Sequence, residues 1–237
     1  MFKHKRRFSW LDYLQEQSKT IQEPLLKCFY QSQLDFIQDK TLRAAEFVAL
    51  DFETTGLCPE QDEIVSVGLV PFTLQRIKVA QAKHWLVRPQ GQLSDESVVI
   101  HGITHSDLSQ APSLDKVLQS LLPELQGKVV VVHYQFIERE FLAQASARLM
   151  GQELIFPMID TMAIEARWHR MGWRSELKRW FGAKQVSIRL ADSRVRYGLP
   201  RYQMHSALTD AIATAELFQA QVRHRFSDSD YVSDVWQ

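Results

Sequence analysis

Two acidic residues at the end of an apolar stretch have the spacing of a metal site. Residues 47–57 read Phe-Val-Ala-Leu-Asp-Phe-Glu-Thr-Thr-Gly-Leu, so Asp51 and Glu53 directly follow a run typical of a buried strand. Because residues two apart in a strand face the same way, both carboxylates project together, while Phe52 points toward the core. Such neighbours raise each other's pKa unless positive charge lies between them, and a hard divalent cation with oxygen ligands meets that need. The alternative is an exposed acidic strand end that leads into a turn.

A third acid, Asp210, follows a histidine near the C-terminus. Ser206 is a good N-cap, so a helix that begins there carries Asp210 in its second turn and leaves His205 in the preceding loop. Residues five apart on one continuous helix point about 140° away from each other, so only the loop position lets His205 face the same site as Asp210. The alternative is a capped helix with a solvated acid and a loop histidine. Small residues would let this helix approach a sheet closely: Ala207, Ala211 and Ala215.

A fourth acid, Glu138, comes shortly after a second buried strand. The run Val129–Val132 is continuously apolar, which is typical of a strand covered on both faces, and it ends at His133. A helix is expected to begin near Glu138. The carboxyl ends of strands are where α/β sheets usually place their sites. A first-turn acid is also favoured by the helix dipole, so a purely structural role is the alternative.

The elements that would hold these acids alternate between strands and helices. We expect strands at 47–50, 64–70, 83–87, 129–132 and 154–156, and helices at 113–126, 138–150 and 206–222. This pattern predicts a mixed α/β sheet covered by helices. We divide the chain into an N-terminal helical extension (1–44), a central domain (45–224) and an acidic tail (225–237), and we expect the tail to be frayed from Ser227 onward.

Composition narrows the class of protein. The 237 residues are 45% hydrophobic and 24% charged, which excludes a mainly disordered or fibrous chain. Lys+Arg and Asp+Glu both number 28, so a bulk polybasic binder is not expected. The longest uncharged stretch, 64–75, is too short to cross a membrane, and the basic N-terminus lacks the apolar run of a secretory signal. Two cysteines are too few to stabilise a fold of this size by disulfide bonds, so a reducing, cytoplasmic location is the default expectation.

Three segments, taken in their order along the chain, resemble the motifs of the DEDD-type 3′–5′ exonuclease superfamily. The segments are 47–56, 133–142 and 205–211, and 100–104 and 159–161 fit as well. The resemblance covers about residues 45–222. It is closest to the branch with a histidine in the last motif (DEDDh), which includes the proofreading epsilon subunit of bacterial DNA polymerase III, ribonuclease T and oligoribonuclease. The resemblance implies a ribonuclease-H-like fold, with a mixed five-stranded sheet flanked by helices.

The resemblance also implies a two-metal mechanism. Asp51, Glu53 and Asp210 would hold one Mg²⁺ or Mn²⁺, Asp51 would bridge to a second ion, and Glu138 would bind through water or close the cluster. Two such ions stabilise the attacking and leaving oxygens of an in-line displacement. His205 would take the proton of the attacking water. The products would be nucleoside 5′-monophosphates released from a 3′ end.

The second motif departs from the family at two positions. Tyr134 stands where the family usually has Asn, and Glu138 stands where it usually has Asp. Glu140 competes for the acid position. Glu138 fits better because Phe141 and Leu142 then follow at the family's spacing. A non-catalytic module that binds nucleic acid or a polymerase is therefore the alternative from another class.

Three further residues would meet the substrate in the family. The backbone at Thr54 would contact the terminal nucleotide, Leu57 would wedge between the last bases, and His101 would line the site. Leu57 could equally be a core residue, and His101 could equally belong to a plain turn.

The segment 167–201 is unusually basic. It holds ten Lys/Arg against two acids, with Trp168, Trp173, Trp180 and Phe181 interleaved. A cationic groove with aromatic platforms would suit single-stranded nucleic acid, whereas a solvated helix face with core tryptophans is the alternative.

We expect single-stranded DNA or DNA 3′ ends as substrate. RNA is the alternative, because discrimination of the 2′-hydroxyl depends on pocket shape. Residues 1–44 would either pack on the domain or dock a polymerase or another protein, and exposed Trp10 and Leu14 would favour docking.

Overall fold

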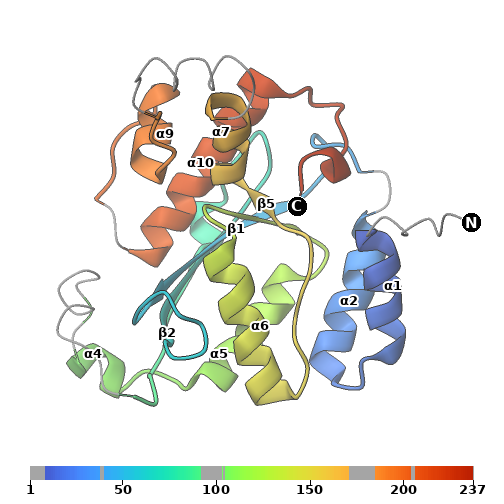
Figure 1. Cartoon of the computed structure of the whole chain (residues 1–237), viewed down its shortest axis with the longest axis vertical. Helices are drawn as coiled ribbons and strands as arrows, with labels where there is room; N and C mark the ends of the chain where they lie inside the picture. Colours follow the sequence, from blue (N-terminus) through green and yellow to red (C-terminus); the bar gives the residue numbers. More distant parts are fainter. Residues whose placement is uncertain are drawn as a thin grey trace, which may run out of the picture.

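A mixed five-stranded sheet forms the centre of the protein. The computed structural model describes residues 9–37, 40–91, 103, 105–170, 185–203 and 206–236. The sheet has the strand order β3-β2-β1-β4-β5. Figure 1 labels β1, β2 and β5. Its strands are β1 (Phe47–Thr54), β2 (Ile64–Phe72), β3 (Lys83–Leu86), β4 (Val129–Val132) and β5 (Ile159–Asp160). The expected mixed five-stranded sheet is confirmed.

Strand register explains why β1 presents its acids at an open edge. β1 pairs with β2 in antiparallel orientation over its whole length, and it pairs with β4 in parallel orientation only from Phe47 to Ala49. β4 ends at Val132. The part of β1 from Asp51 onward therefore extends beyond the carboxyl end of β4, and it leaves room there for side chains from other elements.

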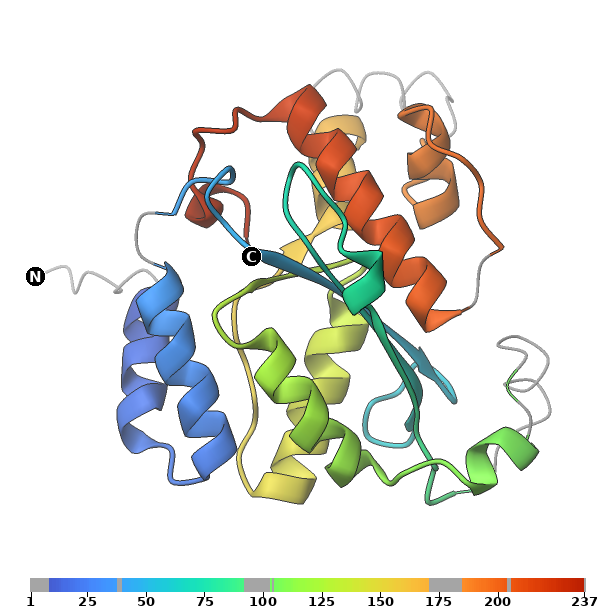
Figure 2. The same cartoon turned by 180° about the vertical axis from the view of Figure 1, so that it is seen from behind.

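Helices cover both faces of the sheet. In Figures 1 and 2, α7, α9 and α10 lie on one side, and α5 and α6 lie on the other with α1 and α2 beside them. Their bounds are α1 (Trp10–Thr20), α2 (Pro24–Ile37), α4 (His105–Ser109), α5 (Leu114–Leu125), α6 (Phe136–Met150), α7 (Thr161–His169), α9 (Leu190–Arg196) and α10 (Ala207–Arg225), with short 3₁₀ helices at Val79–Gln81 and Val232–Asp234. Among the described residues, none of these helices combines the length and apolar character that a bilayer crossing requires.

The N-terminal helices are part of the main core. Leu14 of α1 and Phe29 of α2 are fully buried in the same apolar cluster as the sheet. Trp10 is half-buried, and the Arg139 guanidinium of α6 lies 5.5 Å from the centre of its ring. Of the two arrangements considered for the N-terminal extension, the structure shows that α1 and α2 pack on the domain, and the buried Leu14 gives no support to docking.

The expected frayed tail is also wrong. Val232 and Val235 are buried in the main cluster. The Val232 N–H donates to the Lys40 carbonyl at 3.0 Å, and Leu42 N–H donates to the Asp230 carbonyl at 2.8 Å. Two apolar side chains among the acids anchor the tail, whereas the sequence interpretation gave weight only to its charge.

The expected strand at 154–156 is not formed. Leu154 and Phe156 are buried, but the segment pairs with no strand among the described residues, and β5 lies further along at Ile159–Asp160. The Tyr30 hydroxyl makes the hydrogen bonds to the Ile155 backbone that a neighbouring strand would otherwise make. It donates to the Ile155 carbonyl and accepts from the Ile155 N–H, both at 3.0 Å.

We expect Tyr30→Phe to lower the free energy of unfolding by about 1–3 kcal/mol, because it leaves both backbone groups of Ile155 without their partner. Urea unfolding of the variant and the wild type measures this. Tyr231→Phe is the control, since Tyr231 is 47% exposed. Equal unfolding midpoints for Tyr30→Phe and wild type would show that the hydroxyl is not needed.

Candidate active site

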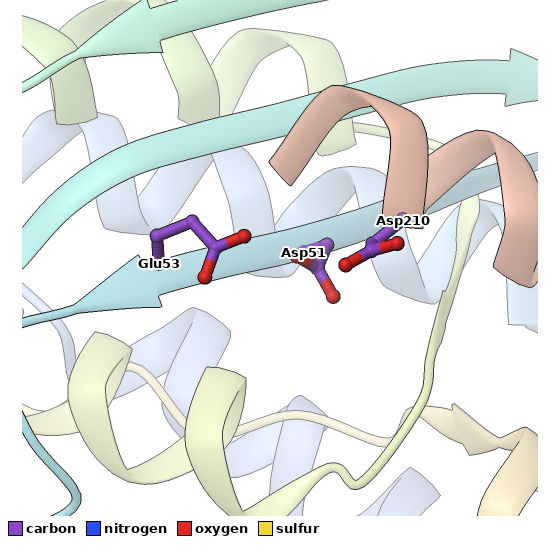
Figure 3. A group of neighbouring side chains, drawn as sticks. All are labelled: Asp51, Glu53 and Asp210. Atoms are coloured by element: carbon purple, nitrogen blue, oxygen red, sulfur yellow. The ribbon is translucent and has the colours of Figure 1, made fainter. Parts of the chain in front are cut away.

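Three carboxylates from distant parts of the chain converge at the end of β1. Asp51 and Glu53 lie on the same face of β1, and Asp210 reaches them from the first turn of α10 (Figure 3). One carboxylate oxygen from each of the three lies within 4.8 Å of the others. Glu53 and Asp210 are 7% exposed and Asp51 is partly exposed. The shared face expected from the Asp-x-Glu spacing is observed.

A glycine on β2 allows α10 to come close enough. Gly68 pairs with Asp51 across the two strands. A Cβ at Gly68 would lie 2.1 Å from the backbone carbonyl carbon of Ala207, so any side chain there would overlap the first residue of α10. The small Ala207 and Ala211 of α10 are fully buried against the sheet, as their size suggested. The sequence interpretation missed Gly68, although a glycine inside a β-branched strand is a known sign of close backbone approach.

Glu138 approaches this group from the opposite layer, but it is not one of the three acids whose oxygens all lie within 4.8 Å of one another. It lies in the first turn of α6 and is only 2% exposed, whereas Glu140 is exposed. The backbone of Phe52, between the two acids of β1, is near enough to its carboxylate to offset in part the rise that burial causes in the pKa of Glu138. Glu138 Oε2 is buried and has no hydrogen-bond partner in the part of the chain that the structure describes. Of the two candidate acids, Glu138 is the buried one, and its charge adds to the rise that burial causes in the pKa of Asp51; its role as a metal ligand stays a prediction.

The electrostatics of the cluster favour a bound cation. Burial raises the pKa of Asp51 well above its usual value, and the charges of Glu138, Glu53 and Asp210 raise it further. Burial also raises the pKa of Glu138; backbone hydrogen bonds oppose this shift, and the charges of Asp160 and Glu53 add to it. Carboxylate oxygens alone make a hard donor set, which suits Mg²⁺ or Mn²⁺. The residues present therefore fit a divalent cation site.

Asp160 fixes the turn that carries Glu138. Its Oδ1 accepts from the backbone N–H groups of Tyr134 at 3.0 Å and Met162 at 2.8 Å, and its Oδ2 accepts from Gln135 N–H at 3.2 Å. One buried carboxylate thus caps α7 and also holds the loop between β4 and α6. Asp160 belongs to the segment 159–161 that the sequence comparison noted, but its role becomes visible only in the structure.

The side chain of His133, which directly follows β4, is held in place by a hydrogen bond. Its Nδ1 lies 2.8 Å from the Thr161 hydroxyl, which itself donates to the Val132 carbonyl at 2.9 Å. Burial lowers the pKa of His133 to about 4, so the ring is neutral at physiological pH. These contacts indicate that His133 has a structural role at the start of the second motif.

The turn after β1 is closed by its own side chains. The Thr54 hydroxyl donates to the Gly56 carbonyl at 2.6 Å, and the Thr55 N–H donates to the Glu63 carbonyl at 2.9 Å. A Cβ at Gly56 would meet the Asp62 carboxylate at 2.4 Å, so a side chain there would require Asp62 to move. The N–H of Thr55 is therefore engaged within the turn. Leu57 is 74% exposed, so its alternative as a core residue is wrong.

Two histidines and part of the basic segment cannot be placed. His205, His101 and residues 171–184 lie outside the described residues. Within the described part of the basic segment, Arg194 is 1% exposed and its guanidinium lies 2.6 Å from a Glu216 oxygen. Arg196 is paired with the buried Glu165. These two arginines hold α9 against α10 and α7, so they are not part of a solvated cationic groove.

Comparison with known proteins identifies the family. The profile of the RNase T family, described as Exonuclease, matches residues 48–218. The chain belongs to the DEDDh branch of this exonuclease family. It is accordingly an enzyme of the 3′–5′ exonuclease family. It is homologous to the epsilon subunit and to the PolC exonuclease domains of DNA polymerase III.

Individual relatives match most of this chain. A DNA polymerase III PolC-type protein of Thermotoga maritima is 34% identical over 181 residues, which are 76% of this chain but 12% of that protein. The epsilon subunit of DNA polymerase III from Treponema pallidum is 27% identical over 75% of this chain and 77% of that one. The chain thus spans a small share of the PolC-type relatives.

Solved structures share the fold. The nuclease domain of 3′hExo, a DEDDh member bound to rAMP, has a TM-score of 0.60 at 17% identity and covers 76% of this chain and 92% of that one. Exonuclease X in complex with 5′ overhanging duplex DNA has a TM-score of 0.55 at 23% identity and covers 79% and 98%. At these identities the likeness establishes the ribonuclease-H-like exonuclease fold.

We expect Gly68→Ala to lower kcat by about 100-fold, because a displacement of α10 by about 1 Å would move Asp210 away from its partners. Nuclease assays and a Mg²⁺ titration would measure the loss. Gly91→Ala is the matched control, since the nearest atom that a Cβ there would meet among the described residues is a Glu63 carboxylate oxygen at 3.8 Å. Full activity in Gly68→Ala would show that α10 can retreat without disturbing the cluster.

We expect Asp51→Asn to stabilise the metal-free protein by about 1–2 kcal/mol at pH 8. Because the folded-state pKa of Asp51 is raised, its ionisation costs stability as the pH rises through that value, and the gain should shrink toward pH 5. Thermal unfolding in EDTA and then in Mg²⁺ measures this. Mg²⁺ should stabilise the wild type and not the variant. Glu140→Gln, on the exposed side of α6, should show no such gain; equal behaviour of Asp51→Asn and wild type would contradict the repulsion.

Proposed function

We propose that the chain is a metal-dependent 3′–5′ exonuclease that acts on single-stranded DNA or DNA 3′ ends and releases nucleoside 5′-monophosphates. The observation that carries this proposal is the group of carboxylates at the end of β1, with oxygens of Asp51, Glu53 and Asp210 within 4.8 Å of one another. The family membership supports the same chemistry.

The acids would have distinct roles. Asp51, Glu53 and Asp210 would hold a divalent ion, Asp51 would be shared with a second, and Glu138 would close the cluster directly or through water. When bound, two Mg²⁺ or Mn²⁺ ions supply positive charge to the attacking and leaving oxygens. The turn that Asp160 fixes lies just before Glu138 and would aim its carboxylate, whose side chain is one methylene longer than that of aspartate.

His205 would take the proton from the attacking water. An imidazole with an ordinary pKa of about 6.5 is largely neutral at physiological pH and can accept that proton. In the sequence His205 stands directly before Ser206, the N-cap residue of α10, and five residues before Asp210.

Substrate contacts follow from the same assignment. The exposed Leu57 would wedge between the last bases, the backbone at Thr54 would contact the terminal nucleotide, and His101 would line the pocket. DNA is favoured as substrate because relatives that match at 27–34% identity are DNA polymerase III components. RNA is the second candidate, since a structure with the same fold is the nuclease domain of 3′hExo bound to rAMP.

A polymerase is the proposed protein partner, by analogy with these relatives. Docking through residues 1–44 would have to use the outward faces of α1 and α2. Their inward faces, which include Leu14 and Phe29, are buried in the core.

The test is the digestion of 5′-labelled oligonucleotides, supplied as DNA and as RNA, with Mg²⁺ and with EDTA. We expect a Mg²⁺-dependent ladder that shortens from the 3′ end, faster on DNA, and a drop in kcat of about 10²–10⁴-fold in His205→Ala. His224→Ala, at the exposed far end of α10, is the control and should be unchanged. Faster RNA digestion would favour the second candidate, absence of digestion would favour a binding module, and an unchanged kcat in His205→Ala would remove its role as base.

A further inference from the structure

Two aromatic side chains stand in solvent at the turn between β4 and α6. Tyr134 is 44% exposed and Phe136 is 42% exposed. Their ring centroids are 5.8 Å apart, and their planes are inclined by 31°. Rings of this size bury a large apolar area when they pack, so a pair that remains in water contributes little to the core.

The backbone at Tyr134 shows that folding alone does not explain this residue. Its φ of +79° is the only positive value at a non-glycine position within the described ranges. A bulky side chain adopts this conformation at a cost, and asparagine adopts it more readily. The carboxylate of Asp160 holds the turn in place through the N–H groups of Tyr134 and Gln135. A tyrosine is thus kept in a conformation that a smaller residue would take more easily, with its ring in solvent.

The position of the pair relates it to the acidic cluster. β4 ends at Val132, beside the part of β1 that leads into Asp51, and α6 begins at Phe136 and carries Glu138 toward the cluster. Both rings thus belong to the turn that joins the end of β4 to the first turn of α6, the turn that carries Glu138. A strand whose 3′ end reached the carboxylates of the cluster would place a nearby base within reach of this turn.

We propose that Tyr134 and Phe136 form a stacking platform for one unpaired nucleobase close to the 3′ end of the substrate. This inference rests on the proposed function and deepens it, since it names single-stranded ends as the substrate class. Every base has a π-face, so stacking on the platform tolerates any sequence and does not sense the 2′-hydroxyl. A base inside a duplex is already stacked on its neighbours, so a paired end would have to open before its base could occupy the platform.

The experiment compares Tyr134→Asn with the wild type on a 5′-fluorescein-labelled oligothymidylate. KM is measured with Mg²⁺, the dissociation constant is measured by fluorescence anisotropy in EDTA, and thermal unfolding is followed in parallel. We expect KM and the dissociation constant to rise about 5- to 100-fold, with kcat nearly unchanged and the unfolding temperature equal or higher. Tyr134→Trp should retain wild-type affinity. Tyr231→Asn, at an equally exposed tyrosine of the C-terminal segment, should change neither constant.

A second arm tests the base itself. Oligothymidylates with a single abasic residue at successive positions from the 3′ end should bind the wild type more weakly at one position, and Tyr134→Asn should be indifferent to that position. If Tyr134→Asn binds and cleaves like the wild type, or loses only stability, the platform is refuted while the nuclease assignment stands. If the wild type degrades no oligonucleotide, the proposed function fails, and the anisotropy measurement still decides whether the platform binds a base.

Discussion

Mutual repulsion between carboxylates is the constraint around which this protein is organised. Asp51, Glu53, Glu138 and Asp210 come from three separate elements, and burial together with like charge raises the pKa of Asp51 and Glu138. Without a cation the cluster opposes the fold, so the surrounding packing must hold it closed. The sheet, the buried face of α10 and the first turn of α6 supply that packing, and the same repulsion favours the binding of a divalent cation.

Two residues outside the cluster allow the acids to come together. Gly68 removes the side chain that would keep α10 away from β2, and Asp160 fixes the turn from which α6 starts. Neither residue is part of the cluster. Each acts through backbone position, Gly68 by leaving space and Asp160 by hydrogen bonding to N–H groups. The geometry of the site is thus set from both faces of the sheet independently.

Much of this arrangement could be predicted from the sequence, because its main elements have strong local patterns. The apolar run into Asp51, the four valines before His133 and the Ser206 cap each indicated an element that the structure shows. Features that depend on contacts between distant segments could not be predicted. Ile155 was expected in a strand because its neighbours are apolar, but its backbone is paired with the Tyr30 hydroxyl, more than a hundred residues earlier in the chain. Likewise, the charge of the tail suggested fraying, and the buried Val232 shows otherwise. Arg194 was counted as a surface charge, and its ion pair with Glu216 became visible only in three dimensions.

The antiparallel bridge between Thr41 and Tyr231 joins segments that lie on either side of the family match at residues 48–218. The apolar cluster likewise draws on Leu14, Phe29 and Val232, all beyond those limits. The unit of homology is therefore smaller than the unit of folding. A fragment trimmed to the homologous region would leave an apolar flank open to water.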